Sequence, residues 1–248
     1  WNRQRYFTPA SNMKVFTLYA ALKTLPRQIP AVKYQRLGDT LHVMGTGDPS
    51  PLHPVFGDST AVDFIRRFDH VVLYPGTLSE PAWGTGWAWD DFDRYYMAER
   101  NALPIYGNVV RMINTPRVLQ VVPEIFRDSV INQKEAYRRR PEKNEFFHHN
   151  SMPDTVDVPI KLSPFLTQTL WEQALGKRVT KGVRLPDGTW ERLPGLHSDT
   201  LYREMMTISD NFLAEQLMLL VSSTLGDSLS FGKADAVVVV AQDTILAD

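Results

Sequence analysis

The sequence contains no cysteine, no long apolar run and almost no net charge. The absence of cysteine from its 248 residues excludes a disulfide framework, a thiolate metal site and a cysteine nucleophile. The longest apolar run is the six residues from Ala236 to Ala241, far below the roughly 20 residues that a helix needs to cross a bilayer. Because the 27 Lys and Arg are balanced by 28 Asp and Glu, the net charge is only −1, and no long-range electrostatic attraction for nucleic acid or anionic lipid is expected. We therefore expect no membrane span and no nucleic-acid partner.

The remaining composition is that of a folded protein with many turns. Hydrophobic residues make up 43% of the chain, and the 17 Pro and 14 Gly predict frequent turns. The length allows one large or two small domains. Residue 1 is a Trp followed by a polar, basic stretch, without the apolar core of a signal peptide, so we expect a mature or trimmed chain.

The hydrophobic pattern divides the chain into helix, a β-rich middle and further helices. Residues 11–25 have apolar side chains at helical spacing, which predicts a buried helix. Further helices are predicted at 60–68, at 164–175 before Gly176, and in three segments between about 200 and 246. Strands are predicted at 31–37, 41–45, 71–76, 109–113, 118–122 and 157–162. Residues 134–155 are polar, charged and interrupted by proline, which predicts a loop or a mobile excursion. This order indicates one lobe inserted within another.

A first candidate for chemistry is Ser11 with Lys14, a Ser-x-x-Lys at the start of a predicted helix. Residues three apart share a helix face, so the Lys14 amine can approach the Ser11 hydroxyl. The free N–H groups and the dipole at a helix start favour an oxyanion nearby. A Lys14 with lowered pKa could then act as base for nucleophilic attack by Ser11. The structural alternative is a helix-capping serine beside a solvated lysine.

A second candidate is Ser209-Asp210-Asn211, directly before an amphipathic helix. These residue types are also preferred helix caps, so the triplet alone is equally consistent with capping. Its pairing with Ser-x-x-Lys favours chemistry, since class A β-lactamases and penicillin-binding proteins carry both motifs in this order. Ser209 could then relay a proton between Lys14 and a leaving amine, and Asn211 could donate hydrogen bonds to the substrate amide and to Lys14.

Five ordered blocks resemble one family of this group. Residues 8–17 (TPASNMKVFT) are similar to the PASNxKLxT segment of the D-Ala-D-Ala carboxypeptidase/endopeptidases, the class C low-molecular-mass penicillin-binding proteins of DacB type. The other similar blocks are residues 45–52 (GTGDPSPL), residues 87–91 (WAWDD), the positions 95–98, 102–103 and 108–110, and residues 209–215 (SDNFLAE). The resemblance covers most of residues 8–217.

The resemblance implies an α+β fold with a β-lactamase/penicillin-binding-type serine transferase domain, incomplete here. That domain would comprise residues 1–27 and 193–248, with an inserted β-rich region at 28–192; the 198 residues from Ser11 to Ser209 agree with such an insertion. Ser11 would be the nucleophile, Lys14 the general base, and Ser209 and Asn211 would serve proton transfer and substrate orientation. No metal or other cofactor is implied.

The same resemblance implies a serine-type D-Ala-D-Ala carboxypeptidase of the periplasm or another extracytoplasmic space. It would hydrolyse peptidoglycan stem peptides through an acyl-Ser11 intermediate and be trapped by β-lactams. Two alternatives stay open: a non-catalytic peptidoglycan-binding relative, and a β-lactamase-like or esterase-like hydrolase. The family's third motif, Lys-Thr-Gly, does not occur before Asp248, so we expect this chain to be part of a larger enzyme. The oligomeric state is not predicted.

Other residues allow a functional interpretation beside a more ordinary one. Three tryptophans, Trp83, Trp87 and Trp89, could stack on sugars or form a packed aromatic cluster, and we expect the cluster. Asp90, Asp91 and Asp93 fit turns or caps better than a metal site. We expect solvated histidines at 148–149, because no third ligand lies at metal spacing, and an exposed loop face at Arg138–Arg140. His197, Ser198 and Asp199 are adjacent and cannot form a triad among themselves.

Overall fold

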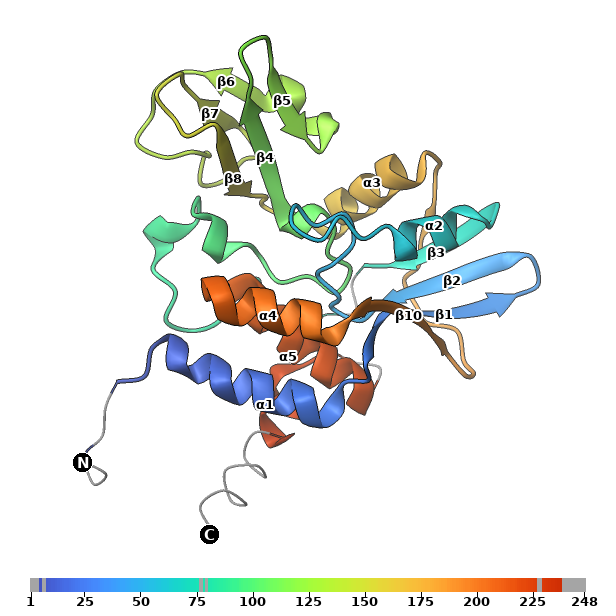
Figure 1. Ribbon diagram of the computed structural model, residues 1–248. Coiled ribbons are helices and arrows are strands. Elements are labelled where there is room, and N and C mark those ends of the chain that lie inside the picture. Colours follow the sequence, from blue (N-terminus) through green and yellow to red (C-terminus); the bar gives the residue numbers. More distant parts are fainter. Residues whose placement is uncertain (1–4, 6–7, 76–77, 79, 227–228, 238–248) are drawn as a thin grey trace.

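The computed structural model describes residues 5, 8–75, 78, 80–226 and 229–237. Helices gather at one end of the molecule, a five-stranded sheet extends from them, and a small β-lobe lies beyond (Figure 1). The helices and 3-10 turns are η1 (Ser11–Met13), α1 (Lys14–Thr24), α2 (Thr60–Arg66), η2 (Trp89–Asp91), η3 (Tyr95–Met97), η4 (Tyr106–Asn108), η5 (Glu124–Ser129), α3 (Pro164–Leu175), α4 (Ser198–Ile208) and α5 (Asn211–Leu225). The predicted mixture of helices and strands is present.

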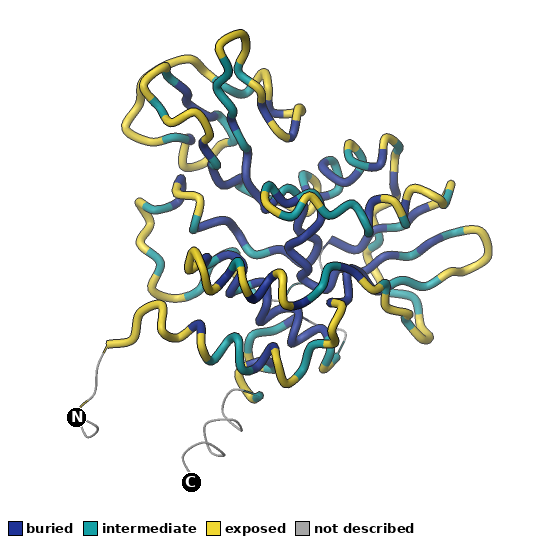
Figure 2. Tube along the Cα trace, in the orientation of Figure 1, coloured by how far each residue is buried: buried dark blue, intermediate teal, exposed yellow. Residues whose placement is uncertain are grey.

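Helix α5 is the centre of the helical end. Eleven of its residues are buried, and Figure 2 shows this helix as a dark, enclosed segment between α1 and α4. Its apolar side chains pack with Ala20 and Ala21 of α1 and with Leu201 and Met205 of α4. Since apolar side chains line α5 on all sides, the helix is stable only inside other elements. This packing places the start of α5 beside the start of α1.

Helix α1 is buried on one face only, which corrects the prediction of a buried helix. Ala20 and Ala21 are fully enclosed, whereas Val15 is 54% and Leu22 is 59% exposed. The apolar residues of this segment are distributed around the helix, so one packed face cannot cover all of them. Lys14, by contrast, is only 7% exposed although it is charged.

The larger sheet has the strand order β10-β1-β2-β3-β9. Its strands are β1 (Gln28–Leu37), β2 (Thr40–Gly45), β3 (His70–Tyr74), β9 (Thr180–Lys181) and β10 (Glu191–His197). β1 pairs antiparallel with both β2 and β10, and β3 is parallel to β2 and β9. β10 was not predicted, because Pro194 and Gly195 interrupt its pattern. The predicted domain limits, at 27/28 and 192/193, lie at the start of β1 and inside β10.

Residues 109–160 form a smaller lobe, called the nested lobe below, at the top of Figure 1. It contains β4 (Val109–Asn114), β5 (Leu119–Val122), β6 (Val130–Asn132), β7 (Phe146–His148) and β8 (Thr155–Pro159). β4 is the middle strand between β5 and β8, and β6 pairs with β7. Strand β7 lies within the segment predicted as a loop. Three consecutive buried residues, Phe146 to His148, form it, and they were hidden by their charged neighbours in the sequence.

The sheet and the nested lobe share one apolar core with α2 and α3. Helix α3 agrees with its predicted limits at both ends. Ser163 accepts the Leu166 N–H at 3.1 Å, Pro164 begins the first turn, and Gly176 ends the helix with a φ of 69°. Trp171 on α3 is fully buried and donates its indole N–H to the Leu103 carbonyl at 3.1 Å. Replacing such a side chain by alanine typically costs about 3–5 kcal/mol.

The last predicted helix, at 233–246, is only partly described. Residues 231–237 are helical, and the rest of this prediction lies outside the described residues. Within the described part of the chain, no helix is both long enough and apolar enough for a transmembrane span.

Candidate active site

The first two predicted site residues meet at the start of α1. Ser11 opens the 3-10 turn η1, which continues directly into α1 at Lys14. Their spacing of three places both side chains on one face, and the Lys14 Nζ donates to the Ser11 Oγ at 3.3 Å. The Ser11 side chain is exposed, whereas Lys14 is buried. The arrangement is therefore a solvent-accessible hydroxyl supported by an enclosed amine.

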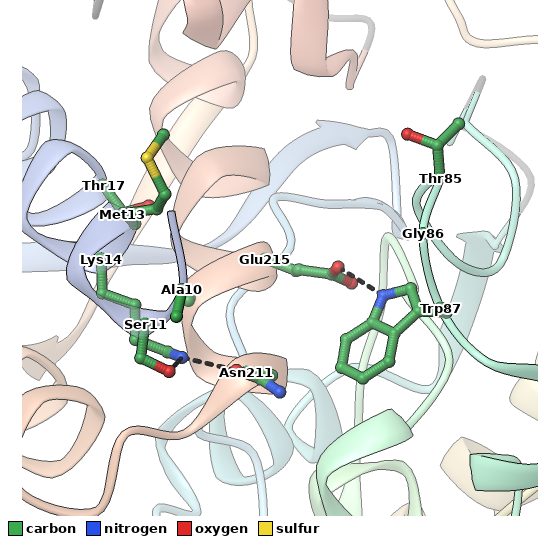
Figure 3. Close-up of a pocket in the computed structure, with 11 residues that line it drawn as sticks. Ala10, Ser11, Met13, Lys14, Thr17, Thr85, Gly86, Trp87, Asn211 and Glu215 are labelled. Carbon is green, nitrogen blue, oxygen red and sulfur yellow. Dashed lines mark hydrogen bonds between the residues drawn. The ribbon is translucent and has the colours of Figure 1, made fainter. Parts of the chain in front are cut away.

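Asn211 joins them from the other end of the chain. Asp210 caps α5 by accepting the Leu213 N–H at 2.8 Å, which makes Asn211 the first residue of that helix. The Asn211 Oδ1 accepts a hydrogen bond from the Lys14 Nζ at 2.5 Å, across 197 positions of sequence. Figure 3 shows Ser11, Lys14 and Asn211 on the same side of a hollow. One amine thus links the nucleophile candidate to the second motif.

Ser209 does not join this cluster. It ends α4 in the left-handed conformation, with a φ of 57° and a ψ of 43°, and its side chain is exposed. Among the described residues, no hydrogen bond connects it to Ser11 or Lys14. Only Ser209 and Asp210 separate α4 from α5, so the chain must turn sharply here. The catalytic role predicted for Ser209 stays a prediction.

The environment of Lys14 favours its neutral form. Burial lowers the pKa of the Lys14 ammonium below its usual value, and the nearby carboxylates of Asp210 and Glu215 act in the opposite direction. Burial also raises the pKa of Asp210, while its hydrogen bonds from the start of α5 and the charge of Lys14 oppose that rise. A lowered pKa increases the share of neutral amine at a given pH, and only the neutral amine can act as a general base.

These residues line a hollow of about 580 Å³, called the serine groove below. One wall comes from residues 10–17, another from α5, and the third from the loop residues Thr85, Gly86 and Trp87 (Figure 3). Glu215 lies on α5 one turn after Asn211 and accepts the Trp87 indole N–H at 3.0 Å. Residues from three distant parts of the sequence therefore line the groove into which the exposed Ser11 side chain opens.

The family of D-Ala-D-Ala carboxypeptidase 3 (S13) matches residues 1–136, more than half of the chain. The chain belongs to the S13 D-Ala-D-Ala carboxypeptidase family. The comparison with curated proteins finds no match.

Solved structures show the fold of this S13 chain in related proteins. It superposes on penicillin-binding protein 4 (DacB) from Haemophilus influenzae with a TM-score of 0.62 and 19% identity, covering 96% of this chain and 62% of that one. A complex of the same protein with a novel β-lactam gives a TM-score of 0.50 and 18% identity, with coverages of 95% and 60%. The S13 chain thus spans less than two thirds of the solved chains. At these identities the likeness shows the fold alone.

Glu215 is a site residue of the S13 chain to which no role was assigned from the sequence, and Trp87 was assigned only to a packed aromatic cluster or a sugar-stacking surface. Both lie in blocks that carry the family resemblance, so the sequence marks them as motif positions without indicating a contact. The available signal was helical spacing, since Glu215 follows Asn211 by four positions and must share its face of α5. Which residue Glu215 binds could not be deduced, because Trp87 is 128 positions away.

Two interpretations of the remaining motifs need correction. The expected solvated histidines are wrong for His148, which lies in β7 and is only 5% exposed. The exposed face expected at Arg138–Arg140 is wrong for Arg139, which is 1% exposed and donates to several backbone carbonyls. Both residues are enclosed because β6, β7 and the chain around Phe92 pack together. Among the described residues, no group of three His, Asp or Glu side chains could hold a metal ion.

The tryptophans do not form a single packed cluster. Trp83 donates its indole N–H to the Met97 carbonyl at 3.0 Å, and the Trp87 ring lies 6.3 Å from that of Tyr96. Trp89 is 71% exposed. Asp91 accepts the Tyr96 hydroxyl at 3.0 Å, consistent with a hydrogen-bonded turn. His197 caps α4 by accepting the Asp199 N–H at 3.3 Å, so this imidazole has a structural contact.

Proposed function

We propose that this chain supplies the nucleophile and base of a serine-type D-Ala-D-Ala carboxypeptidase/endopeptidase acting on peptidoglycan stem peptides. The observation that carries the proposal is the hydrogen-bonded cluster of Ser11, Lys14 and Asn211 at the serine groove in a member of the S13 family. Because the chain spans only part of its solved relatives, the activity is proposed for the whole protein that contains it.

In the first half of the reaction, the Ser11 Oγ attacks the carbonyl carbon of the penultimate D-Ala. Neutral Lys14 accepts the hydroxyl proton as the O–C bond forms. The C–N bond then breaks, and the leaving amine takes up a proton, which leaves an ester on Ser11. We assign to Asn211 the orientation of the substrate amide, and to Ser209 the transfer of the proton from Lys14 to the leaving amine.

In the second half, water attacks the ester carbonyl and releases the shortened peptide, while Ser11 recovers its proton. A β-lactam would acylate Ser11 in the same way, but its amine leaving group stays attached to the acyl group, so it would remain as a stable adduct. The substrate polymer lies outside the cytoplasm, and we therefore propose a periplasmic or other extracytoplasmic location. No metal or cofactor takes part in these steps. We also retain the division into a catalytic domain at 1–27 and 193–248 and an insertion at 28–192.

The deciding experiment is intact-mass analysis of the full-length protein after incubation with a fluorescent penicillin. We expect an adduct of one penicillin on a peptide that contains Ser11, and none in the Ser11→Ala variant. Release of D-Ala from a pentapeptide ending in D-Ala-D-Ala tests turnover in the same preparations. A folded full-length protein that forms no adduct and releases no D-Ala would overturn the proposal. Rapid loss of the adduct, or turnover of simple esters, would instead indicate a β-lactamase-like or esterase-like hydrolase.

A further inference from the structure

The third wall of the serine groove is a loop, residues 82–100, that belongs to neither motif. Its stems are closed on each other, since the Arg100 N–H donates to the Ala82 carbonyl at 2.9 Å and the Trp83 indole donates to the Met97 carbonyl at 3.0 Å. The tip of this loop carries Gly86 and Trp87 into the groove (Figure 3). Closed stems alone do not determine where the tip lies relative to Ser11.

Glu215 binds this loop at two points. Its Oε1 accepts the Trp87 indole N–H at 3.0 Å and the Arg100 Nη2 at 3.2 Å, and its Oε2 accepts the Arg100 Nε at 2.9 Å. The Arg100 side chain is 7% and the Glu215 side chain 18% exposed. A bidentate pair of this kind, shielded from water, is more strongly oriented than a surface ion pair. One carboxylate therefore holds both a stem and the tip of the loop.

The surroundings leave this ion pair little freedom. The Arg100 guanidinium lies 4.0 Å from the centre of the Phe231 ring. A Cβ added to Gly84 would approach the Arg100 Nη2 to 2.5 Å and the Glu215 Oε1 to 3.7 Å. A side chain at position 84 would therefore displace the Arg100 guanidinium. The guanidinium thus contacts the loop backbone at Gly84 and the Phe231 ring as well as Glu215.

We propose that Glu215 is a positioning residue of the serine site, which holds the 82–100 loop against α5 so that Trp87 forms the wall opposite Ser11. The inference rests on the proposed function, because it assigns a role within that site. Glu215 acts through Trp87 and Arg100. Since Glu215 and Asn211 lie one turn apart on the same rigid helix, the wall and the Lys14 partner keep a constant separation.

The charge of Glu215 provides a second test of its positioning role, through the pH dependence of acylation. The charged groups that face Lys14 are Asp210 and Glu215 of α5, while Glu204 of α4 acts on Asp210 and Arg100 pairs with Glu215. Removing the Glu215 charge lowers the pKa of Lys14, because one of the carboxylates that stabilise its ammonium form is lost. Neutral Lys14 is then present at lower pH, so the acidic limb of the pH–rate profile for acylation moves to lower pH.

The test is a double-mutant cycle in the full-length protein with Glu215→Leu, which removes both the charge and the acceptor oxygens, and Trp87→Phe. Trp87→Phe removes the indole N–H but leaves the Arg100–Glu215 pair intact, so it stays informative even if Glu215→Leu destabilises the fold. We expect each variant to lower kcat/KM about tenfold, and the double variant to be no worse than the poorer single variant, because both remove the same contact. Glu145→Gln, which alters an exposed pair in the nested lobe, serves as the matched control and should combine additively with Trp87→Phe.

Hydrogen exchange of the Trp87 indole N–H, followed by NMR, tests the contact without any activity. We expect slow exchange in the wild type and fast exchange in Glu215→Leu, together with the acidic shift of the pH profile. The role of Glu215 alone would be overturned if the wild type forms the penicillin adduct but the kinetic effects are additive and the Glu215 variant has the pH profile and the indole exchange rate of the wild type. Absence of the adduct in the wild type would instead overturn the proposed function and the role within it.

Discussion

The serine groove and the nested lobe are held together in different ways. In the groove, side chains far apart in sequence bind each other directly, as when Lys14 of α1 donates to Asn211 of α5 across 197 positions. The nested lobe relies on backbone pairing of strands within residues 109–160, and its buried cation, Arg139, is bound by carbonyls of its own loop and of Phe92. We therefore expect substitutions in the groove to change chemistry, and substitutions in the lobe to change stability.

A polar link from α5 connects the groove to the sheet. Gln216 is fully buried, donates its side-chain amide to the carbonyls of Gly47 at 2.8 Å and Asn101 at 2.9 Å, and accepts the Asn101 N–H at 3.1 Å. Gly47 has a φ of 84°, which favours glycine, and its N–H donates to the Ala102 carbonyl at 2.9 Å. The turn at 45–49 is thus a structural contact with α5, which explains its place among the motif blocks without a catalytic role.

The largest effect that separates the two regions is expected for Lys14→Met. Removing the base should lower the rate of Ser11 acylation about a thousandfold, while thermal unfolding changes little because Met fills the buried position with a side chain of similar length and the partly exposed Asn211 can bind water instead. Stopped-flow acylation with a fluorescent penicillin measures the rate. Lys23→Met, at the exposed end of the same helix, is the control and should acylate normally. Retained acylation in Lys14→Met would show that another group is the base.

A pH effect is expected at Asp48, in the turn that contacts α5. Burial raises the pKa of the Asp48 carboxyl from 3.8 to about 7. The folded protein then binds this proton more tightly than the unfolded chain, so the Asp48 contribution to stability falls as pH rises from about 4 to about 7 and stays constant above. Asp48→Asn should therefore gain stability over the wild type across this window, by at most about 4 kcal/mol.

Urea unfolding at several pH values measures this difference. The comparison with the variant is needed because burial lowers the pKa of His53 to about 4, and His53 gives the opposite slope between about 4 and 6.5. Asp39→Asn, in an exposed turn, is the control. A constant difference between Asp48→Asn and the wild type from pH 4 to 8 would contradict the prediction.

In the nested lobe, Arg139→Met should lower the free energy of unfolding by about 3 kcal/mol. The variant removes the guanidinium that donates to the Phe92 carbonyl in a buried bond and to carbonyls of the 140–143 segment in part-buried bonds. Chemical denaturation measures the loss, and Arg117→Met, whose side chain is exposed in the same lobe, should stay within about 0.5 kcal/mol of the wild type. The acylation rate of Ser11, measured where both proteins are folded, should not change. A slower acylation would show that the lobe and the groove are coupled.

The smallest effect, about 2 kcal/mol, is expected for Gln216→Leu, which breaks the link between groove and sheet. Loss of the amide leaves the Asn101 N–H and the carbonyls of Gly47 and Asn101 without their partner. Both unfolding and acylation should respond, because α5 carries Asn211 as well. Gln173→Leu, exposed on α3, is the control for unfolding. A variant that changes neither quantity would mean that α5 is held by apolar packing alone.

Much of the fold was predictable from local pattern. The limits of α3 agree because Ser163, Pro164 and Gly176 are strong helix signals, and the strands β1 to β5 lie where β-rich runs are bounded by turns. The exceptions have physical reasons. Strand β10 contains Pro and Gly, and β7 is three residues long, so tertiary pairing rather than propensity decides both.

For the site, the sequence by itself determined the local part. The spacing of three between Ser11 and Lys14, their position at a helix start, and the capping role of Asp210 all follow from neighbouring residues. The contact between Asn211 and Lys14 was predicted with Asn211 as donor, and the tertiary structure makes Lys14 the donor. Only the tertiary structure decided that Glu215 holds Trp87, that Ser209 stands outside the hydrogen-bonded cluster and that Arg139 is buried. Each of these depends on which distant segment packs beside the residue, and hydrophobic periodicity specifies that a face is buried without specifying against what.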